Sequence, residues 1–172
     1  MKIIILNGSS CSGKSSIIKN LMNERKVLFY LHYDSLKWSF SGYSREKHYK
    51  DVQKIVLAVA QEAFNLGYDV VSDSSLTREF REKLINLAKQ KNYEVIEINL
   101  EADFDILLKR FNERVESALK VPEKERRISN LSVDRFKEIY NIYNFEKSTN
   151  AIVFRTDKES PEEIAEKIDK MF

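Results

Sequence analysis

Short apolar runs and longer amphipathic segments alternate along this chain. Runs rich in branched and aromatic side chains predict β-strands at residues 2–6, 27–31, 69–72, 93–100 and 151–154. Between these runs, apolar side chains recur at intervals of three or four residues, the spacing of one buried helix face. Strands that alternate with helices indicate an α/β fold with a parallel sheet.

The predicted helices differ in how clearly their ends are marked. A glycine turn at Asn7-Gly8 separates the first strand from the first helix, and Ser160 to Glu163 forms a capping box with Pro161 at the first helical position. The apolar period fails between residues 117 and 132, where charged residues cluster. The buried stripes comprise Ile17, Ile18, Leu21 and Met22; Val52, Ile55, Val56, Val59 and Ala63; Phe80, Leu84, Leu87 and Ala88; Phe104, Leu107, Leu108, Phe111 and Val115; and Val133, Phe136, Ile139, Tyr140 and Tyr143.

Composition narrows the class of protein. A chain of 172 residues that is 42% hydrophobic can bury one sizeable core, so residues 1–172 are expected to form a single domain. With 29 basic and 27 acidic residues, the net charge of +2 carries no dominant nucleic-acid footprint. Residues 2–6 are too short for a signal-peptide core, and no later run approaches the ~20 apolar residues of a membrane span. We expect a cytoplasmic protein.

The first turn carries the strongest chemical signal. Its residues match G-x-x-x-x-G-K-S/T in full, between a hydrophobic strand and an amphipathic helix. Glycines allow backbone N–H groups to fold around phosphate oxygens, and the helix N-terminus adds partial positive charge. The lysine would reach the outer phosphates, while the serine hydroxyl would bind Mg²⁺. The predicted nucleotide-binding residues here are Gly8, Ser9, Ser10, Cys11, Ser12, Gly13, Lys14, Ser15 and Ser16.

Two carboxylates follow predicted strands. Asp73 comes directly after a buried strand, where an acid can bind Mg²⁺ together with Ser15; the alternative is that Asp73 caps the next helix. Asp34 follows the second strand and is the candidate general base for an incoming hydroxyl; the alternative is an N-cap of a short turn through Trp38.

Arginines lie before and inside the charged segment at residues 117–132. Arg110 and Arg114 are four residues apart on one helix face, and Arg126 and Arg127 lie within the segment. Such a group could bind the charge of a transferring phosphate when a lid closes, although a solvated helix face with Glu113 and Glu116 is the alternative for any single arginine.

Other candidate residues carry weaker signals. Aromatic and basic residues at about 35–50 could form the wall of an acceptor pocket or could belong to the core. His32 and His48 have no partner at metal-ligand spacing and are assigned no role. Cys11 cannot form an internal disulfide and is interpreted as a small loop residue.

Residues 4–15 and the Asp34-Ser35-Leu36 triplet resemble the chloramphenicol phosphotransferase-like P-loop kinases. Weaker similarity continues through Asp73, the helix with Arg110 and Arg114, and residues 156–160. The resemblance implies a three-layer, five-stranded parallel sheet of the nucleoside-monophosphate-kinase type, ATP and Mg²⁺ as cofactors, and Asp34 as base. It also implies that Thr156 and Asp157 lie near the adenine. This sequence has Ser72-Asp73 where the chloramphenicol enzyme has two successive acids.

These observations predict transfer of the γ-phosphoryl group from ATP to a hydroxyl of a small molecule. A nucleoside or a polynucleotide 5′ end is the alternative acceptor, because aromatic and basic side chains can stack on and bind nucleic acid. A different class of function is a nucleotide-dependent binding module in which the triphosphate orders residues 117–132 for a protein partner.

Overall fold

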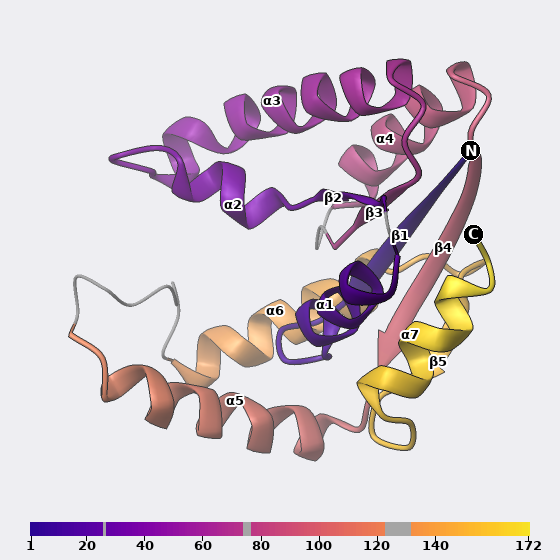
Figure 1. The fold of residues 1–172 in the computed structure, drawn as a ribbon. Coiled ribbons are helices and arrows are strands. Elements are labelled where there is room, and N and C mark those ends of the chain that lie inside the picture. The colour runs from indigo at the N-terminus through magenta and orange to yellow at the C-terminus, as the bar shows by residue number, and fades with distance from the viewer. Residues whose placement is uncertain (26, 74–76, 123–131) are drawn as a thin grey trace.

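The computed structural model describes residues 1–25, 27–73, 77–122 and 132–172. Strands and helices alternate over most of this length (Figure 1). The strands are β1 (Lys2–Gly8), β2 (Phe29–Leu31), β3 (Val70–Ser72), β4 (Glu94–Glu101) and β5 (Ile152–Arg155). The helices are α1 (Lys14–Glu24), α2 (Tyr33–Trp38), α3 (Arg45–Asn65), α4 (Arg78–Gln90), α5 (Phe104–Leu119), α6 (Val133–Glu146) and α7 (Pro161–Asp169).

The five strands form one parallel sheet in the order β2-β3-β1-β4-β5. β1 lies at its centre and pairs with β3 from Ile3↔Val70 to Ile5↔Ser72, and with β4 along its whole length. The predicted five-stranded parallel sheet is therefore confirmed. Because all strands run the same way, the loops that follow them meet at one edge of the sheet.

Alternate side chains of β1 enter two different cores. Ile3 and Ile5 are buried in a cluster formed with α3 and α4, whereas Ile4 and Leu6 are buried in a cluster formed with α1 and α7. This alternation follows from the two-residue period of a strand. Figure 1 shows these two pairs of helices on opposite faces of the sheet, which gives the expected three layers.

A third, smaller core joins α5 to α6 beside the β1–α1 loop. Phe111 stacks on Phe136 with ring centroids 4.6 Å apart, and Leu107 is buried with them. Cys11 of the loop packs against this cluster. The contact places α5 next to the loop that follows β1.

Several element boundaries differ from the predicted ones. β2 begins at Phe29 rather than at residue 27, and Val27 is exposed. α3 begins at Arg45, well before the first predicted stripe residue, because His48 Nδ1 accepts from the amide N of Ser44 at 2.9 Å and satisfies the helix start. α5 continues through Ser117 to Leu119. The segment predicted as an insertion at 35–50 is therefore mostly α2 and the start of α3.

Some apolar residues of the predicted stripes face solvent. Met22, Ile55 and Val133 are exposed. The buried face of α3 is centred on Val56 and Ala60, which leaves Ile55 near its edge. Within the 35–50 segment, Phe40 packs against a core, as one of the two alternatives expected, whereas Trp38 is exposed.

Caps at two helix starts are well defined. Thr77 caps α4 by accepting from the amide of Phe80, so Asp73 is not the cap of that helix. Ser160 and Glu163 form the predicted capping box of α7. Within the described ranges, no helix combines the length and the apolar character that a membrane crossing requires.

Candidate active site

The loop between β1 and α1 makes a compact turn that depends on its small residues. A Cβ placed on Gly8 would lie 2.2 Å from Ser12 Oγ, so only glycine fits without a shift. Gly13 has φ of 89° directly before α1, and Cys11 has φ of 65°. A positive φ is uncommon outside glycine and concentrates at functional turns. The chain thus accepts local strain in order to form this loop.

Lys14 lies across the mouth of the loop. Its Nζ donates to the carbonyl oxygens of Gly8 at 2.6 Å and Ser9 at 2.9 Å. Burial lowers the pKa of Lys14, while the negative charges of Asp73 and Asp34 oppose that shift. The ammonium is therefore surrounded by loop oxygens and lies within the field of both candidate carboxylates.

A cavity of about 580 Å³ lies in front of this loop. It brings together most of the residues that the sequence singled out from distant parts of the chain. Its lining includes Ser10, Cys11, Ser12, Gly13, Lys14, Ser15, Ser16, Asp34, Asp73, Arg110, Arg114 and Thr156. Arg126 and Arg127, and most of the predicted lid, lie outside the described residues.

Asp73 is a buried carboxylate at the end of β3. Only 8% of its surface is exposed, and burial raises the pKa of Asp73. Tyr30 Oη donates to its Oδ2 at 2.6 Å, and His32 Nε2 lies 3.6 Å from the same oxygen. Asp73 therefore lines the cavity while Tyr30 of β2 donates to its side chain and His32, directly after β2, lies beside it.

Asp34 faces the same cavity from the first turn of α2. The N-cap position of this helix is His32, so the alternative interpretation of Asp34 as an N-cap is wrong. Asp34 Oδ1 forms an ion pair with Lys37 Nζ at 2.9 Å, and 58% of the Asp34 side chain is exposed. An accessible carboxylate at this position can meet an incoming hydroxyl.

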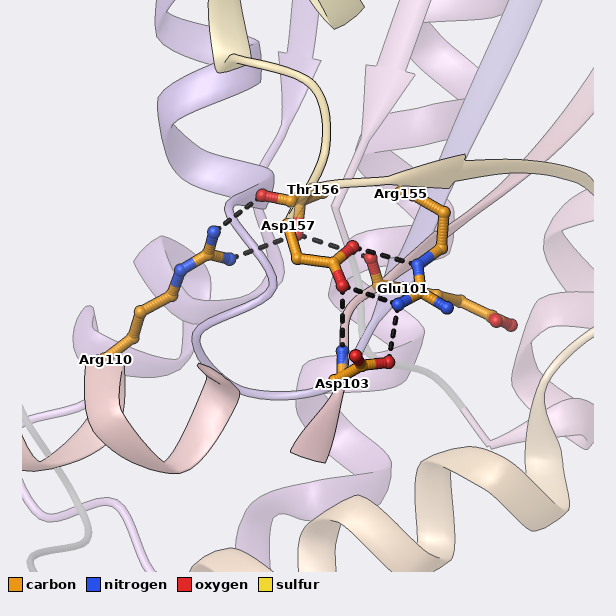
Figure 2. Close-up of polar contacts among 6 residues, drawn as sticks. All are labelled: Glu101, Asp103, Arg110, Arg155, Thr156 and Asp157. Atoms are coloured by element: carbon orange, nitrogen blue, oxygen red, sulfur yellow. Dashed lines mark hydrogen bonds and ion pairs between the residues drawn. The ribbon is translucent and has the colours of Figure 1, made fainter. Parts of the chain in front are cut away.

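The two arginines of α5 lie in different surroundings. Arg110 is bound to Thr156, with Nη1 3.1 Å from Oγ1 and Nη2 2.6 Å from the carbonyl oxygen (Figure 2). Arg114 also lines the cavity, and its positive charge contributes to the lowered pKa of Lys14. The side chain of Arg114 is exposed to solvent, whereas that of Arg110 is partly buried.

Asp157 does not line the cavity with Thr156. Arg155 holds its carboxylate through Nε and Nη2, and Nη2 also reaches Asp103, as Figure 2 shows. These hydrogen bonds lower the pKa of Asp157. Its carboxylate therefore connects the loop after β5 to the loop after β4.

The donor set at the cavity fits a magnesium ion bound with phosphate. Ser15 and Asp73 offer a hydroxyl and a carboxylate, and Mg²⁺ in such sites typically takes one or two protein oxygens beside phosphate and water. Across the described ranges, no cluster of three or more His, Cys, Asp or Glu side chains offers a site made by protein alone. The residues suit an ion that arrives with a nucleotide.

Sequence reasoning missed Tyr30 and His32. Their rings stack with centroids 4.8 Å apart and planes 14° from parallel, and His32 Nδ1 lies 2.6 Å from Ser35 Oγ. The available signal was their spacing, with two ring side chains at alternate positions before Asp34. Tyr30 lies on β2 and His32 directly follows it, and β2 is the neighbour of the strand that precedes Asp73.

Solved structures share this fold over nearly the whole chain. Kti12 of Chaetomium thermophilum, in complex with ADP-AlF3, has a TM-score of 0.70 at 14% identity, covering 98% of this chain and 96% of that one. The APS kinase CysC of Mycobacterium tuberculosis, in complex with AMPPNP and APS, has a TM-score of 0.69 at 18% identity, with coverages of 99% and 96%. A tunicamycin resistance protein of Deinococcus radiodurans has 0.64 at 17%, with coverages of 99% and 94%.

At identities this low, the similarity establishes the fold alone. The amino-acid sequence itself matches a protein family over most of its length: residues 3–139 match the model of a family described as an AAA domain. The match includes the loop after β1, both candidate carboxylates and the arginines of α5.

Proposed function

Because this chain belongs to the AAA domain family AAA_33, matched over residues 3–139, we propose that it is a kinase dependent on ATP and magnesium. In this proposal it transfers the γ-phosphoryl group to a hydroxyl of a small molecule, as the chloramphenicol phosphotransferase-like kinases do. One observation carries the proposal: Lys14, Ser15, Asp34 and Asp73 line a single cavity. The kinases among the structures with the same fold support the reaction class.

The loop formed by Gly8 to Ser16 would bind the phosphates through its backbone N–H groups and the start of α1. Lys14 would neutralise the outer phosphates, since its ammonium already lies at the loop mouth. Ser15 and Asp73 would hold magnesium, which neutralises charge on the phosphate oxygens during transfer. Thr156 would lie on the adenine side, with Asp157 supporting its loop.

Asp34 would accept the proton of the acceptor hydroxyl as the oxygen attacks the γ-phosphorus. The new O–P bond forms while the bond to the β-phosphate oxygen breaks, and ADP leaves with the released electron pair. Arg114, with Arg126 and Arg127, would stabilise the charge on the transferring group. In this proposal residues 1–172 form one domain, residues 35–50 lie on the acceptor side, and residues 117–132 form the lid.

The direct test measures ADP release from ATP and Mg²⁺ across antibiotics, sugars, nucleosides and oligonucleotides, with Lys14→Ala as the blank. The proposal requires at least one hydroxyl compound that stimulates release in the wild-type protein and not in the blank. Nucleotide binding in calorimetry without stimulation by any acceptor would instead favour the nucleotide-dependent binding module.

A second surface feature favours the polynucleotide alternative for the acceptor. A groove of about 610 Å³ lies between α3, α4 and the end of α6. Four cations and two acids line it, together with Phe145, whose surface is 77% exposed. Both acids are already bound, Glu79 by Lys83 and Glu146 by the amide of Arg78. The cations are Lys50, Lys54, Arg78 and Lys83.

The groove adjoins the candidate active site. Tyr33 lines the first cavity, and its ring lies 6.5 Å from that of Tyr49 and 6.4 Å from that of Phe80, which both line the groove. A chain with its 5′-hydroxyl at Asp34 could extend past Tyr33 and place phosphates among the cations. Lys50→Glu with Lys54→Glu should then impair phosphorylation of a 5′-hydroxyl oligonucleotide, whereas Lys19→Glu on the opposite face should not. If the wild type, the Lys50→Glu/Lys54→Glu double variant and Lys19→Glu all phosphorylate the oligonucleotide at equal rates, the groove does not bind the acceptor.

A further inference from the structure

Two ring side chains contact the carboxylate of Asp73 at the same oxygen. Tyr30 Oη donates to Oδ2 at 2.6 Å, and His32 Nε2 lies 3.6 Å from Oδ2. Both contacts depend on the sheet, because β2 pairs with β3 in the register Tyr30↔Val71 and so brings Tyr30 beside the end of β3. Among the described residues, the hydrogen bond from Tyr30 and the contact with His32 both fall on Oδ2.

His32 is itself held in place from two sides. Its ring stacks on that of Tyr30, and Ser35 Oγ lies 2.6 Å from Nδ1. The tautomer that satisfies both contacts accepts the Ser35 proton at Nδ1 and carries a proton at Nε2, which faces Asp73. Ser35 lies next to Asp34 in α2. One imidazole thus connects the first turn of α2 to the carboxylate at the end of β3.

This arrangement selects one orientation of Asp73. With Tyr30 donating to Oδ2 and His32 next to the same oxygen, the rotamer of Asp73 is restrained, and among the described residues Oδ1 has no such contact and is available to an ion or its bound water. A fixed ligand loses less conformational entropy on binding than a free one does. Side chains that orient ligands in this way typically change metal affinity by about 10- to 100-fold when they are removed.

We infer that Tyr30 and His32 are positioning residues that hold Asp73 ready to bind nucleotide-associated magnesium, and that Ser35 connects this arrangement to the helix that carries Asp34. The inference rests on the proposed function for the role of Asp73. It adds residues that act through Asp73, of which His32 also lines the cavity, and it extends the magnesium site into β2 and the start of α2.

The test measures binding of a fluorescent ATP analogue by anisotropy, as a function of Mg²⁺ concentration and separately in EDTA. In Tyr30→Phe, we expect the Mg²⁺ midpoint to rise by about 10- to 100-fold while affinity in EDTA stays at the wild-type value. Tyr93→Phe is the matched control, because it removes a hydroxyl that donates to the Tyr68 carbonyl at 2.8 Å, far from the cavity. The control should keep the wild-type midpoint.

A double-variant comparison separates positioning from general destabilisation. In an Asp73→Asn background, Tyr30→Phe should cause no further rise in the midpoint, because its effect passes through the missing carboxylate. Ser35→Ala, at an exposed helical position, provides a variant that is expected to fold normally and to raise the midpoint by a smaller factor.

Unchanged midpoints in both Tyr30→Phe and Ser35→Ala would overturn the inference. So would an equal loss of affinity with and without Mg²⁺, which is the signature of a structural role. Failure of the proposed function would give a separate result in the wild-type protein. The wild type would bind the nucleotide equally well in Mg²⁺ and in EDTA, or would not bind it at all.

Discussion

Arg110 of α5 is bound to Thr156 through both terminal nitrogens of its guanidinium, 3.1 Å from the hydroxyl and 2.6 Å from the carbonyl oxygen. The helix after β4 is thereby attached to the loop after β5, at the edge of the candidate nucleotide cavity. The same helix presents Arg114 one turn later. Two arginines that look equivalent in sequence therefore have different expected effects.

Arg110→Ala should destabilise the protein, whereas Arg114→Ala should not. Loss of the two hydrogen bonds to Thr156 is expected to lower the free energy of unfolding by about 1–2 kcal/mol and to weaken nucleotide binding through the loosened loop. Arg114→Ala should leave stability near the wild-type value and lower turnover. Urea denaturation and steady-state kinetics on both variants check this, and equal stability losses would contradict it.

Asp34→Asn should separate binding from transfer. The substitution keeps the size of the side chain and removes its basicity, so transfer should fall by about 10²–10⁴-fold while nucleotide affinity remains. Lys37→Ala is the paired control, since it frees the Asp34 carboxylate from the 2.9 Å ion pair without removing it. Turnover in Asp34→Asn at the wild-type rate would exclude Asp34 as the base.

Gly8→Ala should distort the loop between β1 and α1, because the added Cβ would lie 2.2 Å from Ser12 Oγ and 3.2 Å from the Leu100 carbonyl. Overpacking of this kind typically costs about 1–3 kcal/mol, and a displaced loop should also bind nucleotide less tightly. Gly42→Ala is the control, since a Cβ there has no heavy atom within 4 Å among the described residues. Calorimetry of nucleotide binding and thermal unfolding would report both effects; normal binding by Gly8→Ala would show that the loop adapts.

Asp157→Asn should reduce stability in a way that depends on pH. The Arg155 guanidinium lowers the pKa of Asp157 in the folded protein, so the unfolded chain binds more protons as the solution is acidified. The stabilising contribution of the carboxylate is therefore complete above its ordinary pKa near 4 and is lost as the pH falls toward the lowered folded value. The difference in unfolding free energy between wild type and Asp157→Asn should shrink on acidification below about pH 4.

Glu82→Gln, on the exposed face of α4, controls for the general loss of a negative charge. Its difference from the wild type should vary less over the same pH range. A difference for Asp157→Asn that stays constant down to the acid transition would show that folding does not lower the pKa of this carboxylate.

The sequence alone predicts those features of this protein that depend on residues close together in the chain. Residues 8–15 carry the candidate phosphate-binding loop as a contiguous motif, and the period of apolar side chains predicts the alternation of strands and helices. The parallel sheet then places Asp34 and Asp73 at one edge, because both follow strands that run the same way. These parts follow from short-range spacing and from one rule of topology.

Only the tertiary structure decided which side chains hold the candidate site together. Tyr30 and Asp73 are 43 residues apart, and Arg110 and Thr156 are 46 apart. Such contacts depend on strand register, on the packing of α5 and on side-chain rotamers, which are set by the whole core rather than by any local pattern. The sequence therefore points to the candidate loop and the two candidate carboxylates, whereas the side chains that contact Asp73 and Thr156 come together only when distant segments pack.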